Sequence, residues 1–105
     1  MAGANVSKAQ AYHGTTTNSY VDTVVITGQY RKIKIVNRSA VELYYTISFG
    51  GAPATPTVAG DNCLVLEAVI GASAEFTIDS ASLKNTKVLL IASSPCSYTI
   101  QGLQA

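Results

Sequence analysis

The sequence predicts an all-β protein, an antiparallel β-sandwich or jelly roll of about seven to eight strands with an extended N-terminal arm. From Tyr20 onward, apolar residues recur with a period of two, which is typical of half-buried strands. Turn-forming Gly, Asn, Asp, Ser and Pro separate these segments at short, regular intervals, and no segment has the helical period. A chain of 105 residues fits one domain.

The first 19 residues differ in composition from the rest of the chain. They consist mainly of Ala, Gly, Asn, Ser, Gln and Thr, with few large apolar side chains. Such a segment buries too little apolar surface to offset the entropy of ordering it. We therefore predict an extended N-terminal arm over 1–19, ordered by a neighbouring subunit, and a β-sandwich domain over 20–105.

Four segments alternate most clearly, namely 31–37, 41–49, 74–79 and 96–102. In the second of these, Val41, Leu43, Tyr45, Ile47 and Phe49 share one face. The same alternation gives the expected core, which is Ile33, Ile35, Leu43, Tyr45, Ile47, Phe76, Ile78, Tyr98 and Ile100.

Three further strands are predicted over 20–27, 63–70 and 86–92. These segments are rich in β-branched and aliphatic residues but alternate less cleanly, as expected where both faces are covered. Residues 52–56 form the one longer loop, because its two prolines cannot donate to a central ladder. Only residues 81–85 have the composition of a helical turn.

Low charge narrows the range of partners. Charged residues make up 12% of the chain, the net charge is +1 and the mean hydropathy is +0.25. Nucleic-acid binding needs several clustered cations, so we do not expect it. No apolar run approaches the length of a membrane span, and the first residues lack a signal peptide, so we expect synthesis in the cytoplasm. A surface of such low charge favours packing against a protein partner.

The chemistry-bearing residues predict neither catalysis nor a cofactor or metal. His13 is the only histidine and lies in the arm, where no scaffold is expected to hold it beside a nucleophile. Cys63 and Cys96 are predicted to be buried thiols, with a disulfide as the alternative, and zinc would lack two ligands. The six acids carry no local signature of a glycosidase pair. Glu67 is predicted to point outward from an edge strand.

The candidate residues for partner binding lie in three places. The arm offers an aromatic anchor and a threonine run, one face of the strand over 31–37 offers two lysines, and one tyrosine on an outer strand face offers a ring for stacking on a sugar. These residues are Tyr12, Thr15, Thr16, Thr17, Lys32, Lys34 and Tyr44.

Several segments together resemble small structural proteins of tailed bacteriophages. The resemblance covers about residues 30 to 103 and rests on the segments 34–38, 43–47, 50–53, 60–66, 88–93 and 98–102. It implies a virion protein, either a capsid decoration (cement) protein or a minor capsid protein. Such a protein binds the outer surface of the head, with the major capsid protein and/or copies of itself as partners. A tail or head-completion protein and a carbohydrate-binding or adhesin-like module of a virion are the alternatives, the last with a glycan as ligand.

Overall fold

A computed structural model describes residues 5–8, 10–27, 30–77 and 86–103. Within these ranges the chain forms strands and loops and no helix. The strands are β1 (Asn5–Lys8), β2 (Ala11–Thr15), β3 (Asp22–Ile26), β4 (Lys32–Asn37), β5 (Leu43–Phe49), β6 (Leu64–Leu66), β7 (Ser73–Thr77), β8 (Thr86–Ile91) and β9 (Ser97–Leu103). All seven strands expected from alternation and composition are present, and two more lie before them.

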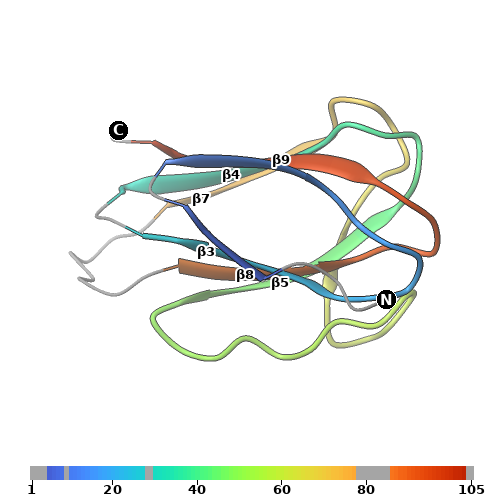
Figure 1. The fold of residues 1–105 in the computed structure, drawn as a ribbon, viewed down its shortest axis with the longest axis horizontal. Coiled ribbons are helices and arrows are strands. Elements are labelled where there is room, and N and C mark those ends of the chain that lie inside the picture. The colour runs from blue at the N-terminus through green and yellow to red at the C-terminus, as the bar shows by residue number, and fades with distance from the viewer. Residues whose placement is uncertain (1–4, 9, 28–29, 78–85, 104–105) are drawn as a thin grey trace.

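The strands form two sheets packed face to face (Figure 1). One is a five-stranded sheet in the order β1-β3-β8-β5-β6, and the other is a four-stranded sheet in the order β2-β9-β4-β7. From β2 onward, the first strand pairs with the last, the second with the last but one, and so on inward to β5 and β6. This is the topology of a jelly roll, a long hairpin wound into two sheets. The predicted fold class is confirmed.

The N-terminal segment differs from the arm predicted over residues 1–19. It is extended, but both of its strands belong to the sandwich of this chain. β1 pairs in parallel with β3 at the edge of the five-stranded sheet, and β2 pairs antiparallel with β9 at the edge of the four-stranded sheet. None of the side chains described between residues 5 and 15 is fully buried. These strands are held mainly by backbone pairing. Side-chain periodicity does not report such pairing, so it did not predict these two strands.

One glycine explains how β2 approaches its neighbour. A Cβ built on Gly14 would lie 2.8 Å from the hydroxyl oxygen of Tyr98 on β9 and would also overlap the ring of Tyr12. Both rings lie close together, with centroids 6.1 Å apart. Gly14 therefore leaves the space that the Tyr12 and Tyr98 side chains occupy.

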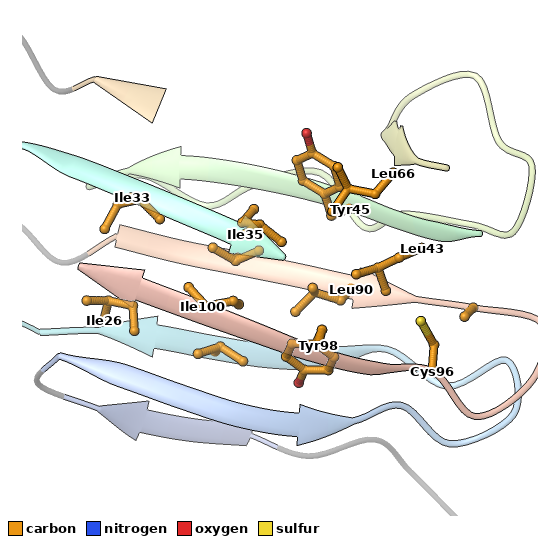
Figure 2. Close-up of a cluster of buried hydrophobic side chains, with 13 residues drawn as sticks. Ile26, Ile33, Ile35, Leu43, Tyr45, Leu66, Leu90, Cys96, Tyr98 and Ile100 are labelled. Carbon is orange, nitrogen blue, oxygen red and sulfur yellow. The ribbon is translucent and has the colours of Figure 1, made fainter. Parts of the chain in front are cut away.

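The hydrophobic core lies between the two sheets (Figure 2). Six of the predicted core residues are buried in it, namely Ile33, Ile35, Leu43, Tyr45, Tyr98 and Ile100. Ile47 and Phe76 are half-buried and pack against it, whereas Ile78 and the segment 81–85 lie outside the described residues. Phe49 lies on the inward face, as expected, with its ring centroid 6.4 Å from that of Phe76, but it is 37% exposed because it is the last residue of β5.

A buried asparagine ties several chain connections together. The Asn37 side chain is fully buried, and its Nδ2 donates to the carbonyl oxygens of Val41 and Glu67, both at 2.8 Å. Its Oδ1 accepts from the Ser39 backbone N–H at 3.0 Å and from the Cys96 thiol at 3.2 Å. The amide is satisfied on both sides, which is what a buried polar side chain requires.

A second buried polar contact joins the two sheets. The Tyr98 hydroxyl on β9 donates to Asp22 Oδ2 on β3 at 2.8 Å, and both residues are almost completely buried. Burial raises the pKa of the Tyr98 phenol above its ordinary value, and the neighbouring Asp22 charge raises it further. The phenol therefore stays neutral in the folded protein at any ordinary pH.

Candidate partner-binding site

The outer face of the four-stranded sheet brings together many of the polar side chains. Alternation along each strand directs one residue into the core and the next to this face. Ser and Thr are its commonest residues, and we name it the hydroxyl face. It consists of Ala11, His13, Thr15, Lys32, Lys34, Val36, Ser73, Glu75, Thr77, Ser97, Thr99, Gln101 and Leu103.

Cross-strand hydrogen bonds order one end of the hydroxyl face. His13 Nδ1 lies 2.8 Å from Thr99 Oγ1, and Thr15 Oγ1 lies 3.1 Å from Ser97 Oγ. The expectation that no scaffold holds His13 is wrong, because β2 pairs with β9 along its whole length. His13 and Thr15 are exposed on the outer face, while Tyr12 and the intervening Gly14 face inward, a pattern with too few large apolar side chains to predict the strand.

Two of the charged side chains on the hydroxyl face have opposite signs and face each other across neighbouring strands. Lys34 lies in register between Gln101 on β9 and Glu75 on β7. Directly opposite positions place Cβ atoms about 5 Å apart, so Lys34 and Glu75 attract across the strands. Lys32 faces Thr77 instead. The face therefore presents hydroxyls with one lysine that has no acid opposite it in register.

Three of the seven candidate residues predicted for partner binding, Thr15, Lys32 and Lys34, share the hydroxyl face. Two others serve the fold. Tyr12 packs against Tyr98, and the buried Thr16 hydroxyl accepts from the Cys96 N–H at 3.0 Å and lies 3.3 Å from the carbonyl oxygen of Ser94, to which it donates.

The remaining two candidates lie elsewhere. Thr17 is half-buried, and its hydroxyl oxygen has no hydrogen-bond partner within the described ranges. Tyr44 lies on the outer face of the five-stranded sheet, where its hydroxyl donates to Glu42 Oε1 at 3.0 Å. This hydrogen bond raises the pKa of Tyr44. The sequence reasoning missed Ser97, Thr99 and Glu75, although each alternates with a predicted core residue.

A loop covers part of the outer face of the five-stranded sheet. Figure 1 shows the chain after β5, drawn in green to yellow, running outside that sheet. The Thr46 hydroxyl on β5 donates to the carbonyl oxygen of Ala54 and anchors the loop. A groove of about 440 Å³ lies beside it, and its lining includes Asn62, Cys63 and Leu64.

The two cysteines occupy different environments. Cys96 is fully buried, as predicted, and burial raises the pKa of its thiol. Cys63 was also expected to be buried but is half-buried, because it belongs to the loop just before β6. Its thiol donates to the carbonyl oxygen of Thr57 at 3.4 Å. Both are free thiols, so the disulfide alternative is wrong.

A short segment around β6 exposes large aliphatic side chains. Leu64 is 51% exposed, Val65 47%, Val69 56% and Ile70 71%. We name these four residues the apolar edge, because β6 is the last strand of the five-stranded sheet. Glu67 lies in the same segment and is exposed, as predicted, just past the end of β6.

The described part of the chain contains no group of three or more His, Cys, Asp or Glu residues arranged to hold a metal ion. Among the same residues, there is no helix with the length and apolar character needed to cross a bilayer.

Comparison with known proteins relates the fold to two solved structures. No protein-family model and no curated protein matches the sequence. A de novo designed double-stranded β-helix, solved by NMR in solution, superposes with a TM-score of 0.50 at 13% identity, covering 87% of this chain and 95% of that one. A carbohydrate-binding module from a sugar cane soil metagenome, complexed with cellopentaose and gadolinium ion, gives a TM-score of 0.52 at 15% identity, covering 95% and 92%. At these identities the likeness concerns the fold alone.

Proposed function

We propose that this chain is a non-enzymatic structural protein of a virion. In this proposal it decorates the outer surface of a tailed-phage head and binds the major capsid protein through the hydroxyl face. The observation that carries the proposal is the hydroxyl face itself, a four-stranded surface on which Thr15, Lys32 and Lys34 come together with further hydroxyls. The jelly roll hosts viral capsid proteins as well as lectins, which is support by analogy only.

The physical argument concerns charge and repetition. Charged groups are costly to strip of water and are depleted at the centres of protein interfaces. The hydroxyl face carries three charged residues, Lys32, Lys34 and Glu75, and Lys34 lies opposite Glu75 in register. On a symmetric shell the same modest contact is repeated many times, which stabilises a coat formed of individually weak interfaces.

Copy number in purified particles tests the proposal. Quantitative mass spectrometry of particles from the cells that produce this chain should find it in hundreds of copies. A handful of copies per particle would instead support the tail or head-completion alternative. Absence of the chain from the particles contradicts a virion role.

A matched pair of charge reversals tests the face. Lys34→Glu changes the hydroxyl face, and Lys87→Glu makes the same change on the opposite sheet, where Lys87 is exposed on β8. We expect Lys34→Glu to weaken co-sedimentation with particles lacking the chain by about tenfold, equivalent to about 1.4 kcal/mol. Lys87→Glu should leave it unchanged. Equal effects of the two variants contradict the assignment of the face.

Carbohydrate binding is the second candidate function. The observation that favours it is the fold shared with the carbohydrate-binding module complexed with cellopentaose. Tyr44 is the ring on an outer strand face, and its hydroxyl is oriented by Glu42. Calorimetric titration with cellopentaose, followed by a glycan array, tests this function. Binding that is lost in Tyr44→Ala and kept in Tyr20→Ala, a tyrosine 46% exposed outside the strands, would favour it over a capsid partner.

A further inference from the structure

The apolar edge lies at the β6 edge of the five-stranded sheet. β6 pairs with β5 on one side, and among the described residues no strand lies on its other side. Leu64 and Val65 are about half exposed there, and Val69 and Ile70 extend the apolar surface just past the end of the strand. Unpaired backbone beside exposed aliphatic side chains is the combination that promotes pairing with another strand.

The other three sheet edges lack this combination. β1 exposes Asn5 and Ser7, and β7 exposes Ser73, Glu75 and Thr77. β2 exposes only a histidine and a threonine. Polar and charged side chains of this kind protect an edge from pairing. Within the described residues, β6 is thus the edge strand that exposes large aliphatic side chains, and its chemical match is another β6.

The size of the apolar edge fits an interface between two copies. Its four side chains expose on the order of 400 Å² of apolar surface, as much as the largest patch on a typical monomer. Each partner in a standard interface contributes roughly 800 Å², of which somewhat more than half is apolar. The edge therefore supplies most of the apolar part that one such interface needs.

We propose that two copies of this chain associate through β6, the strand of one copy lying antiparallel beside the same strand of the other and centred on Val65. Because Leu64 and Leu66 flank the centre, each Leu64 then lies opposite Leu66 of the second copy. Val65 lies opposite itself on the outer face. The two five-stranded sheets become one continuous sheet, closed by a two-fold axis.

Charge does not oppose this register. The net charge of each copy is +1, so long-range repulsion is weak. Glu67, the nearest acid, lies two residues from the centre, so the two copies of Glu67 sit at opposite ends of the pair. Four residues of extended strand separate them by about 14 Å, which is beyond the Debye length of about 8 to 10 Å.

Sedimentation equilibrium of the whole chain over a range of concentrations tests the association. We expect the apparent mass to approach twice 10.9 kDa. Val65→Lys places a charge on the pairing edge and should weaken the dimer by at least about tenfold. Val58→Lys is the matched control, since Val58 is 37% exposed in a loop, and it should dimerise like the wild type. A monomer at every concentration, or equal effects of both variants, overturns the proposal.

A cross-link tests the two-fold register. In a Cys63→Ser background, Val65→Cys puts two thiols directly opposite each other, at the Cβ separation of about 4.5 to 5.5 Å expected for facing residues. This is close to disulfide geometry, so mild oxidation should yield a covalent dimer, whereas Val58→Cys should yield none. Higher oligomers, or a dimer that Val65→Cys does not trap, overturn the closed β6 pair.

This association does not depend on the proposed function. It uses β6 and the segment after it, whereas the hydroxyl face belongs to the other sheet. Failure of Lys34→Glu to affect particle binding would leave the dimer intact, and a monomeric chain would leave binding through the hydroxyl face intact. The Lys34 and Lys87 variants therefore test the hydroxyl face, and the Val65 and Val58 variants independently test the dimer.

Discussion

β2 and β9 lie side by side in one sheet, yet they are held in different ways. β9 buries Tyr98 and Ile100 in the core, whereas no side chain of β2 is fully buried. β2 forms because β9 offers it a complete row of backbone partners, with Gly14 leaving room for two tyrosine rings. A strand at a sheet edge can thus be specified by its neighbour instead of by its own apolar pattern.

Removing the Tyr98 ring is expected to have the largest effect. Tyr98→Ala leaves a large cavity between the sheets and removes a hydrogen bond from the buried Asp22. The cost should be about 4 to 5 kcal/mol, a large part of the 5 to 15 kcal/mol that stabilises a typical domain. Urea unfolding followed by circular dichroism measures it.

Tyr12→Ala is the matched change on β2. Its ring is half-buried and contacts Tyr98 from the edge strand, so the loss should be about 1 kcal/mol. If the two substitutions cost the same, the contrast between β9 and β2 is wrong.

Alkaline pH should lower the stability of the fold through Tyr98 on β9, by less than Tyr98→Ala does. Burial raises the pKa of Tyr98 in the folded state, while in the unfolded chain the phenol ionises near its ordinary value of about 10. The stabilisation is therefore complete below pH 10 and declines above it, by up to about 1.4 kcal/mol per pH unit. Cys96 and Tyr45, whose pKa values burial also raises, add to the decline.

Tyr98→Phe separates the contribution of this phenol. At neutral pH it should cost about 1.5 to 3 kcal/mol, because the buried Asp22 loses a hydrogen-bond donor. Thermal melts between pH 9 and about 11 should then fall less steeply than those of the wild type. A parallel decline in both proteins would show that Tyr98 does not titrate as its burial requires.

Deleting residues 2–15 should cost less than Tyr98→Ala and no less than Tyr12→Ala, because it includes Tyr12. The deletion removes both N-terminal strands, but these residues bury no described side chain completely. We expect a loss of about 1 to 2 kcal/mol, or roughly 5 to 15 °C in melting temperature, measured by differential scanning calorimetry. An unchanged melting temperature would mean that the segment behaves as the independent arm its composition suggests. Failure to fold would mean that edge pairing contributes far more than its burial indicates.

The fold class was predictable because alternation is strong where one face of a strand is buried. The residues of β4 illustrate this, since Ile33 and Ile35 point inward and Lys32 and Lys34 outward. Alternation placed Phe49 on the correct face but did not reveal its exposure at the strand end, and the burial expected for Cys63 is wrong because Cys63 lies in a loop. Alternation failed wholly for β1 and β2, whose pairing is determined by backbone hydrogen bonds.

The candidate site was only partly predictable for a related reason. Alternation correctly placed Lys32 and Lys34 on one face of a strand, but it does not reveal which strands are neighbours. The pairing of β2 with β9 brings Thr15 beside Ser97 and His13 beside Thr99, across more than eighty residues of sequence. Such contacts follow from topology, which a local pattern does not contain.

That same pairing has a consequence for how the chain folds. His13 and Thr99 contact each other although 86 positions separate them in a chain of 105 residues. The four-stranded sheet therefore closes only after β9 has left the ribosome. Folds dominated by such long-range contacts have high contact order and fold in milliseconds to seconds. β9 lies between β2 and β4 in the sheet, so both strands lack this partner until β9 is synthesised, and its synthesis sets the earliest moment at which this sandwich can form.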